Sequence, residues 1–397
     1  MKKYIIATAC VCLAVLVAVS FLSGFWEGRQ EMATLKVGFL YESDESTPYT
    51  YNFMRSQSDL EAELGSQVQT LSYSNVHGMD IETPLRDLVR QGCGIIFTNV
   101  ETERLGEIAT EYPQVQFCQQ ALSEMKQTVE PDNYHTFNGE IYQARYISGV
   151  VAGMKLREML DNGKITPQEA KVGFIGAFHN NEVVSSYTAF LLGIHTVAPE
   201  ATMRVKYINV WDSYSKEKKA ARELIAEGCV MLAQYVDTVG IASACQEAAT
   251  RGDQVYHIGF HQSMVDVAPA ASLISIRDNY SPYVIGAVKA VMNHQKIEQA
   301  VTGNVHGTHD ISAGFEQDWV EMLELNETIA APGTQAKIDR LEESFRKGQV
   351  EVFKGNYSGI NPDNPADVID LDKGYTENAE SSAPSFHYLL MNYISIE

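Results

Sequence analysis

The sequence predicts an α/β fold of two Rossmann-like lobes with a hinge between them. Strand-like and helix-like segments alternate along most of the chain, the pattern of a parallel sheet with helices on both faces. Two landmarks recur in register: Lys36–Tyr41 is echoed by Lys171–Gly176, at an offset of 171 − 36 = 135, and Leu88–Cys93 by Leu224–Cys229, at 224 − 88 = 136. An offset this long indicates a duplicated lobe rather than a solenoid repeat.

Composition indicates a globular protein with an acidic surface. The chain has 397 residues, of which 45% are hydrophobic and 20% charged, enough for a substantial core. The formal net charge is −21, which argues against nucleic-acid binding and against a basic membrane-surface patch. Six cysteines occur without a CxxC pair, and we interpret them as small buried hydrophobes rather than disulfides or metal ligands.

The N-terminal segment, residues 1–30, has the pattern of an export signal. Lys2 and Lys3 precede an uncharged run from Tyr4 to Trp26. One interpretation is a signal peptide cleaved near the small residues Ala18–Ser20. The other is a retained N-terminal membrane anchor, since a spanning helix needs about 20 apolar residues. In both interpretations Lys2 and Lys3 stay on the cytoplasmic side, so the chain after the apolar run lies outside. Both therefore predict an extracytoplasmic protein, anchored in the cell membrane or secreted.

Residues 35–137 are predicted to form the first lobe. Its expected strands, rich in β-branched and aromatic residues, are 35–41, 68–73, 94–99 and 114–118. Its expected helices are 52–64, 80–91 and 102–112, and Gly65 and Gly92 are helix-stopping residues. The polar, turn-rich run 131–139 is predicted to cross between the lobes without a regular element.

Residues 138–262 are predicted to form the second lobe, which opens with a long helix over 140–160. Its expected strands are 171–176, 203–210, 229–235 and 255–260, and its expected helices are 183–197, 216–226 and 240–250. A further strand at 272–277 and a helix at 282–294 are expected within a segment of about 263–310 that completes the first lobe. Residues 311–397 are predicted to be a C-terminal extension that packs on the lobes.

Ligands of open α/β sheets bind beyond the carboxyl ends of the strands, and the loops expected there are rich in aromatic residues. These residues are Tyr49, Tyr51, Phe137, Phe178 and Trp211. Rings that converge from two lobes form a slot for a flat ligand, and each offset stack contributes roughly 0.5–1.5 kcal/mol beyond area burial. The alternative for each ring is packing inside its own lobe.

Polar residues in the same loops are candidates for hydrogen bonds to a ligand. They are Asn52, Thr98, Asn99, Glu182, Gln234, Asp237, His261 and Gln262. Each of these residue types is also common at helix caps and turns, so position in a loop leaves both roles open.

The sequence does not favour an enzyme, a cofactor or a metal site. The patterns GxSxG, GxGxxG and GxxxxGK[ST] do not occur. His257 and His261 are four residues apart at the end of a strand, without the Glu of a helical HExxH motif. His306, His309 and Asp310 have the residue types of a metal site, but a solvated turn is the favoured interpretation of their glycine-containing loop.

Several motifs in one order resemble the basic membrane protein family of substrate-binding lipoproteins. They are Lys36-Val-Gly-Phe-Leu-Tyr41 with Tyr49-Thr-Tyr51, Ile95-Ile-Phe-Thr98, Tyr146-Ile-Ser-Gly-Val-Val-Ala-Gly153, Val172-Gly-Phe-Ile-Gly-Ala-Phe178 with Glu182-Val, Asn209-Val-Trp211, Leu224–Gly228 and Met391-Asn-Tyr393. The resemblance covers about residues 35–397. It implies a type I periplasmic-binding-protein fold, which is a clamshell, and delivery of a nucleoside or purine to an ABC importer.

In this family the base lies between aromatic rings, a role that the resemblance assigns to Tyr49 and Phe178. It also assigns cleft-lining positions to Asn52, Thr98, Asn99, Glu182, Trp211 and Asp237. Where relatives commonly read Gly-Tyr-Asp-Ser-Asp-Met, this chain has Gly259-Phe-His-Gln-Ser-Met264. His261 and Ser263 therefore replace both aspartates, including the acidic contact to ribose hydroxyls, so a nucleoside, a nucleobase and another flat polar ligand all remain open.

We therefore predict an extracytoplasmic solute-binding protein of an ABC importer that binds a purine nucleoside, nucleobase or similar flat ligand between two lobes. Its expected partners are the small-molecule ligand, the transporter permease and, through the N-terminal segment, the membrane; we expect a monomer. An alternative is a membrane-tethered subunit that senses ligand for a signalling partner. A nucleoside-processing enzyme is the less favoured third function.

Overall fold

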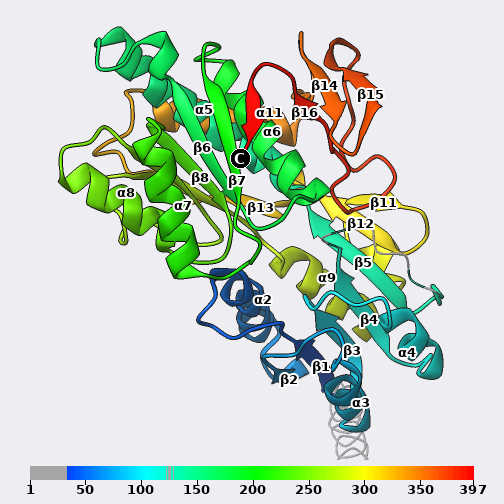
Figure 1. Cartoon of the computed structure of the whole chain (residues 1–397). Coiled ribbons are helices and arrows are strands. Elements are labelled where there is room, and N and C mark those ends of the chain that lie inside the picture. Colours follow the sequence, from blue (N-terminus) through cyan, green and yellow to red (C-terminus); the bar gives the residue numbers. More distant parts are fainter. Residues whose placement is uncertain (1–33, 122, 124–126, 128) are drawn as a thin grey trace, which may run out of the picture.

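Two seven-stranded sheets form two lobes, one mainly blue to cyan and one mainly green (Figure 1). This computed structural model describes residues 34–121, 123, 127 and 129–397. The predicted signal peptide or anchor, residues 1–30, lies outside the described residues. Among those that are described, no helix combines the length and the apolar character that a membrane span requires.

The first lobe is built on a sheet with the strand order β11-β12-β5-β4-β3-β1-β2. Its strands are β1 (Leu35–Leu40), β2 (Val68–Tyr73), β3 (Cys93–Thr98), β4 (Gln116–Gln120), β5 (Tyr134–Gly139), β11 (Asn304–His306) and β12 (Asp310–Ala313). Its helices are α2 (Pro48–Leu64), α3 (Glu82–Arg90), α4 (Leu105–Glu111), α9 (Ser281–Met292) and α10 (Ile297–Ala300). Phe53 of α2 and Tyr283 of α9 pack on one face, and Leu88 and Ile108 on the other.

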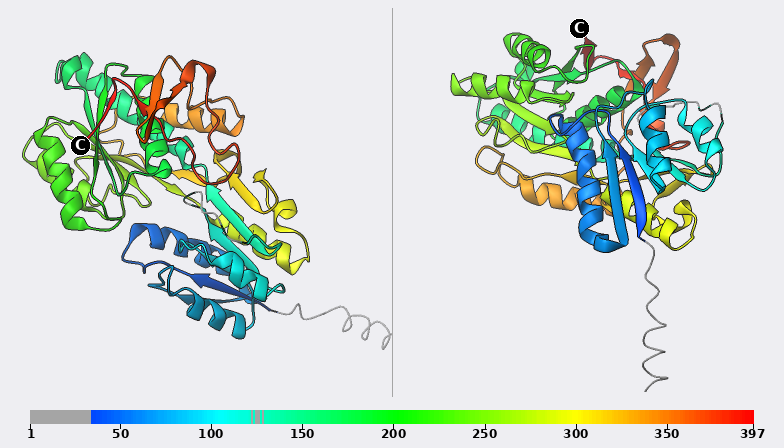
Figure 2. Two further views of the ribbon diagram at one scale, coloured as in Figure 1. Left: turned by 45° about the vertical axis from the view of Figure 1, so that its right-hand side comes forward. Right: turned by 90° about the horizontal axis from the view of Figure 1, so that it is seen from below.

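The second lobe is built on a sheet with the order β13-β10-β9-β8-β6-β7-β17. Its strands are β6 (Lys171–Gly176), β7 (Thr202–Tyr207), β8 (Met231–Tyr235), β9 (Tyr256–Phe260), β10 (Ser272–Asp278), β13 (Val320–Met322) and β17 (Ile394–Ile396). Its helices are α5 (Ile141–Asp161), α6 (Asn181–His195), α7 (Tyr214–Ala226), α8 (Gly240–Thr250) and α11 (Thr334–Arg346). A three-stranded sheet lies beside the second lobe (Figure 2). Its strands are β14 (Ser358–Asn361), β15 (Asn364–Asp370) and β16 (Leu389–Leu390).

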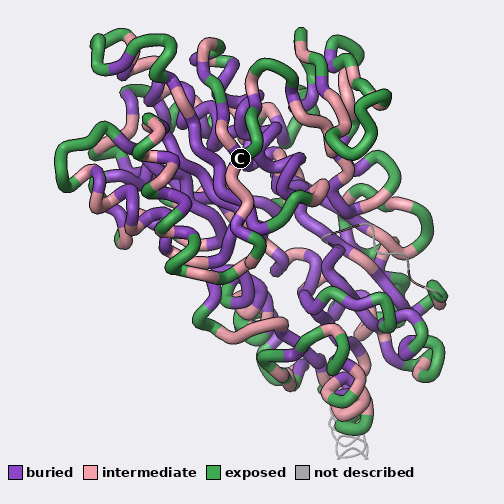
Figure 3. The backbone as a smooth tube through the Cα atoms, in the orientation of Figure 1, coloured by how far each residue is buried: buried purple, intermediate pink, exposed green. Residues whose placement is uncertain are grey.

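Within each lobe the sheet is buried between helices, and exposed residues concentrate in the outer turns (Figure 3). This is the expected consequence of apolar runs in parallel strands that are covered on both faces. Helices α5 and α6 approach each other most closely at two glycines. A Cβ on Gly149 would lie 2.1 Å from the Phe190 carbonyl oxygen, and one on Gly193 would lie 2.1 Å from that of Tyr146.

The predicted α/β class and the two-lobed architecture are confirmed, and the expected burial of cysteines is confirmed for the described ones, which are free and buried. The prediction that 131–139 lacks a regular element is wrong, because Tyr134–Gly139 is strand β5. Polar residues suit this strand since its neighbours satisfy them. The Asn133 side chain, just before it, donates to the carbonyl oxygens of Ala109, Tyr112 and Val115.

The place where the chain returns to the first lobe also differs from the prediction. Strand β10 pairs with β9, so it belongs to the second sheet, and the return occurs at α9 rather than near residue 263. The C-terminal region contributes a strand to each of the two large sheets, because β12 pairs with β5 and β17 pairs with β7. It is therefore more than an extension packed outside the lobes.

Three connections between the lobes meet at one point. A Cβ on Gly139 would lie 2.3 Å from Asp278 Oδ1 and 3.3 Å from the Trp319 carbonyl oxygen. The Asn279 amide donates to the same carbonyl oxygen at 2.7 Å. Gly139 ends β5, Asp278 and Asn279 lie at the end of β10, and Trp319 precedes β13. These connections form the hinge region that the sequence predicts.

Candidate functional site

A cavity lies between the lobes, at the carboxyl ends of strands from both sheets. It is lined by Glu42, Tyr49, Glu101, Gln120, Ser123, Asn138, Ile141, Asn180, Glu182, Trp211, Tyr235, Asp237, His261, Asp278 and Tyr280. Its volume is about 60 Å³, where one water needs roughly 10–15 Å³ of such space. Most of the lining residues are buried, and residues from both lobes contribute to the lining.

Aromatic rings reach the cavity from both lobes. Tyr49, on α2, faces His261 of the second lobe at 5.5 Å between ring centroids. His261 stacks on Phe260 at 3.6 Å, and Phe260 packs against Tyr235 at 4.6 Å. The backbone at His261 has φ 65°, which is uncommon for a residue other than glycine and marks a locally constrained turn.

Buried carboxyl groups give the cavity its charge chemistry. Burial raises the pKa of Asp237 to about 8 and that of Glu182 to about 8. It also raises the pKa of Asp278 to about 7 and that of Glu42 to about 7. Among the described residues that line the cavity, none is Lys or Arg. The cavity therefore favours neutral or cationic ligands over anions.

Few protein groups satisfy these carboxyl groups. The Tyr235 hydroxyl donates to Glu182 Oε1, and His261 Nε2 lies 3.3 Å from Asp237 Oδ1. Asp278 Oδ1 and His261 Nδ1 are buried without a hydrogen-bond partner in the described part of the chain. Burial, with Arg145 as a second cause, holds the pKa of His261 well below its ordinary value, so its imidazole is neutral and one nitrogen accepts.

A buried cation lies near the cavity without lining it. The Arg145 guanidinium, on α5, sits 4.1 Å from the centroid of the Phe260 ring and 5.0 Å from that of Tyr235. Its three nitrogens have no hydrogen-bond partner among the described residues, and burial lowers its pKa to about 10. The guanidinium interacts through the ring faces and lowers the pKa of Asp278, which partly opposes the effect of burial on that carboxyl.

The first-lobe wall, in contrast, is internally hydrogen-bonded. The Tyr49 hydroxyl donates to Gln120 Oε1 at 2.9 Å, and Gln120 Nε2 donates to the Tyr280 hydroxyl at 2.7 Å. Gln120 also reaches Asn138 Oδ1 at 3.5 Å. The polar side chains of this wall therefore satisfy one another.

Five residues selected from the sequence line the cavity: Tyr49, Glu182, Trp211, Asp237 and His261. The three other aromatic candidates do not. Phe137 is fully buried in the first-lobe core and stacks on Tyr283 at 4.0 Å. Tyr51 is 48% exposed, and Phe178 is 37% exposed with its ring edge-on to Trp211 at 5.5 Å. The geometry therefore does not support a stacking role for Phe178, because Trp211 stands at the cavity.

The remaining polar candidates do not line the cavity either, and two of them hold cavity residues in place. Asn52 Nδ2 donates to the Asp278 carbonyl oxygen at 2.8 Å, and Asn99 Oδ1 accepts from the Glu42 amide at 3.0 Å. Both fix the backbone of a carboxyl-bearing residue. Gln262, after His261, contributes its backbone amide to the turn by donating to the Phe260 carbonyl oxygen.

Thr98 and Gln234 bond to nearby loops. Thr98 Oγ1 accepts from the Val100 amide at 3.0 Å, which shapes the turn after β3. Gln234 Nε2 donates to the Val236 carbonyl oxygen at 3.1 Å, which shapes the loop that carries Asp237. Both residues therefore lie at the carboxyl ends of their strands, with side chains that bond to the backbone rather than line the cavity.

Sequence reasoning missed ten lining residues: Glu42, Glu101, Gln120, Ser123, Asn138, Ile141, Asn180, Tyr235, Asp278 and Tyr280. Most of them end a strand or follow one, which is the signal that could have found them. The sequence does not reveal Asn138 because its strand β5 is polar, and it does not reveal Asp278 and Tyr280 because it predicts that β10 lies outside the second lobe.

Comparisons with known proteins agree with this geometry. The family model for PnrA-like substrate-binding proteins of ABC transporters, Bmp, matches residues 34–350. A purine-binding protein of Brucella abortus is 29% identical over 281 residues, 69% of this chain and 74% of its own length. A putative ABC transporter glucose-binding protein of Haloferax volcanii is 33% identical over 117 residues, 30% of this chain and 27% of its own length.

Solved structures share the fold. A solute-binding protein of an ABC transporter from Aeropyrum pernix has a TM-score of 0.63 at 16% identity and covers 79% of this chain and 92% of its own. One from Conexibacter woesei has a TM-score of 0.61 at 18% identity, with coverage of 80% and 97%. The predicted type I periplasmic-binding-protein fold is thus confirmed. The chain belongs to the Bmp family of PnrA-like ABC transporter substrate-binding proteins, which are extracytoplasmic binding proteins rather than enzymes.

Proposed function

We propose that this protein binds a purine, as a free base or a nucleoside, in the cavity between its lobes and delivers it to the permease of an ABC importer. The observation that carries the proposal is the pairing of aromatic rings with buried carboxyl groups that have few partners. The purine-binding relative from Brucella abortus supports the same ligand class.

Purine chemistry fits both kinds of group. Rings such as Tyr49 and Trp211 offer faces or edges to a flat heterocycle. Asp237 and Glu182 become strong acceptors for the N–H groups of a base once they ionise. A phosphorylated nucleotide would bring an anion to these carboxyl groups, which we expect the cavity to reject.

A free base ranks ahead of a nucleoside. The cavity is small, and His261 lines it at one of the two positions where the family commonly has aspartates, which include the acidic contact to the ribose hydroxyls. Ser263, at the second substituted position, is exposed and lies outside the lining. The remaining carboxyl groups are placed to bind ring N–H groups as readily as hydroxyls.

Closure of the lobes follows from the division of the cavity between them. Because Tyr49 and Asp237 belong to different lobes, a ligand makes all its contacts only in the closed form, which shifts the balance between open and closed forms. A shift from 1:99 to 99:1 needs about 5.5 kcal/mol of preference for the closed form. Stacking and several hydrogen bonds, at roughly 0.5–1.5 kcal/mol each, are sufficient. We further propose that, after export, the N-terminal segment is either retained, which anchors the protein in the membrane, or cleaved, which releases the protein.

A thermal-shift screen tests the ligand class. The panel contains purine bases, purine nucleosides, nucleoside monophosphates and glucose. A ligand present at 100 times its dissociation constant adds about 2.7 kcal/mol of stability. We expect bases to raise the melting temperature most and monophosphates not at all. A shift with glucose and none with any purine would overturn the proposal.

A further inference from the structure

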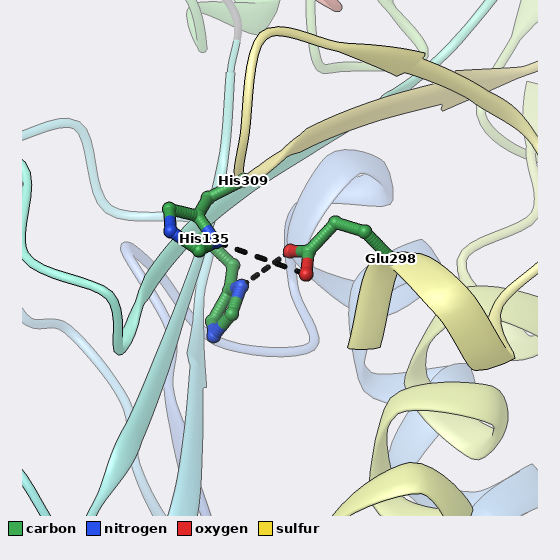
Figure 4. Close-up of side chains that lie close together, drawn as sticks. All are labelled: His135, Glu298 and His309. Atoms are coloured by element: carbon green, nitrogen blue, oxygen red, sulfur yellow. Dashed lines mark hydrogen bonds and ion pairs between the residues drawn. The ribbon is translucent and has the colours of Figure 1, made fainter. Parts of the chain in front are cut away.

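Three metal-ligating side chains converge in the first lobe, away from the cavity between the lobes. His135 lies on β5, Glu298 on α10, and His309 in the loop before β12 (Figure 4). One nitrogen of each histidine and one carboxylate oxygen all lie within 4.8 Å of one another. His135 is near the amino end of β5, whereas Asn138, near the carboxyl end, lines the cavity.

The sheet register places the two imidazoles side by side. Strands β5 and β12 are parallel, and Asp310 pairs with Thr136. The Thr136 amide donates to the His309 carbonyl oxygen at 2.8 Å. The two histidines therefore precede a paired position, and their ring centroids lie 5.3 Å apart at an interplanar angle of 90°. Helix α10 brings the carboxylate to both rings.

Hydrogen-bond geometry indicates that both Nδ1 atoms face the carboxylate. His135 Nε2 lies 2.8 Å from Gln116 Oε1, and an N–H at this nitrogen donates to that oxygen. A neutral imidazole then presents a bare Nδ1 lone pair to Glu298 Oε1 at 2.5 Å. Two acceptors this close repel each other unless a cation, either a proton or a metal ion, joins them.

His309 has the same orientation. Its Nε2 lies 3.5 Å from Asp132 Oδ1, and its Nδ1 lies 3.7 Å from Glu298 Oε2. This Nδ1 is buried and has no hydrogen-bond partner among the described residues. Histidines that ligate metals commonly hold an outer oxygen with the second nitrogen, which fixes the tautomer. Gln116 and Asp132 are placed for this role.

We propose that His135, Glu298 and His309 bind a divalent transition-metal ion of the Zn²⁺ class through two Nδ1 atoms and a carboxylate oxygen. Two histidines and one glutamate form an established zinc ligand set with an open fourth position. Ligands at about 2.0–2.2 Å from a tetrahedral ion lie about 3.3–3.6 Å from one another. The observed ligand atoms all lie within 4.8 Å of one another, so none of their separations exceeds those of this arrangement by more than about 4.8 − 3.3 = 1.5 Å.

The surroundings give the ion access and a structural effect. A groove lined in part by Asp132, His135, Glu298 and His309 opens beside the cluster. The bound ion ties together β5, α10 and the loop before β12, which are distant in sequence. We expect it to stabilise the first lobe without altering ligand binding at the other end of the sheet. The turn that the sequence favours for 306–310 then supplies one ligand.

Metal binding to untagged, chelator-treated full-length protein tests the proposal. We expect calorimetry to give one Zn²⁺ ion per chain, and Co²⁺ to produce the visible absorption of a four-coordinate site. Zn²⁺ should also raise the melting temperature. His309→Ala and Glu298→Gln should remove the Co²⁺ absorption and the stoichiometric binding, with melting in chelator used to verify that each variant is folded.

His306→Ala is the matched control. His306 lies in the same region, but its Nε2 faces Ser312 Oγ at 2.8 Å and it is not part of the cluster. It should bind Zn²⁺ and Co²⁺ as the unsubstituted protein does. No saturable binding by the unsubstituted protein, or equal binding by the His309→Ala and His306→Ala proteins, would overturn the proposal and leave a proton as the shared cation.

Discussion

The two lobes meet the cavity with different chemistry. On the first-lobe side, Tyr49, Gln120 and Tyr280 are hydrogen-bonded in a chain. On the second-lobe side, Asp237 and Glu182 are buried with few partners, and burial raises the pKa of each to about 8. The Tyr49–Gln120–Tyr280 chain of the first wall is therefore satisfied within the protein, although the same wall also carries the buried carboxyl of Glu42. The carboxyl groups of the second wall have few donors and gain from a ligand that supplies more.

This difference indicates which wall recognises the ligand. A wall whose polar groups satisfy one another offers shape and ring surface, while buried carboxyl groups with few donors gain most from a ligand with N–H groups. We infer that the second lobe contributes most of the polar binding free energy. Four substitutions or conditions break or sharpen this comparison.

The largest effect is expected on stability, from the packing behind the first wall. Phe137→Ala should lower the free energy of unfolding by about 3–5 kcal/mol, because the ring is fully buried against Tyr283. Phe178→Ala is the matched control in the second lobe, where the ring is 37% exposed, and its loss should be much smaller. Denaturant unfolding measures both. Equal losses would contradict the assignment of Phe137 to the core.

The next effect is on affinity, from the second wall. Asp237→Ala should weaken purine binding by roughly 10- to 150-fold, the equivalent of about 1.5–3 kcal/mol for a hydrogen bond to a charged group. Asp253→Ala, which removes an exposed carboxylate outside the lining, should leave affinity unchanged. Calorimetric titration of both variants with the same purine measures the two affinities. If Asp237→Ala binds as tightly as the unsubstituted protein, the second lobe does not hold the ligand through this carboxyl.

The third effect is a pH dependence of the ligand-free protein. Asp237 has an ordinary pKa of 3.8 and a folded-state pKa of about 8 because burial disfavours its charge. Between these values the folded state holds a proton that the unfolded chain has lost, so stability falls as pH rises through that window. Asp237→Asn should flatten the decline in melting temperature, while Asp253→Asn should not. Parallel declines in both variants would contradict the raised pKa.

The smallest effect is expected from Phe178→Ala on affinity. Its ring touches Trp211 edge-on and does not line the cavity, so only a few-fold loss through a less well-held Trp211 is expected. Titration with the same purine measures it. A loss as large as that of Asp237→Ala would restore Phe178 as a stacking residue and would imply that the ring turns inward when ligand binds.

The fold was predictable from the sequence because its signals are local. Apolar runs such as 171–176 and stops such as Gly92 mark parallel strands and helix ends without knowledge of their neighbours. Strand β5 was not predictable, because its polar residues find their hydrogen-bond partners only in distant parts of the chain. The Thr136 hydroxyl, for example, donates to Asp310 Oδ1, 174 positions away.

The site was predictable in position and only partly in detail. Tyr49 and Asp237 were found because they follow strands. Phe178 also follows a strand. Whether its ring faces the cavity or solvent depends on how it packs against Trp211, which the sequence does not show. His135 and Glu298 could not be paired from the sequence, because register and a short helix bring them together across 163 positions.

The most direct measurement is a calorimetric titration of the unsubstituted protein with a purine base at pH 7, repeated in two buffers of different ionisation enthalpy. N–H donors from the ligand favour the ionised form of Asp237 and Glu182, whose pKa of about 8 leaves them largely protonated beforehand. We predict saturable binding with net proton release. An absence of binding by any purine base or nucleoside, or binding without proton release, would contradict the recognition of purines by second-lobe carboxyl groups.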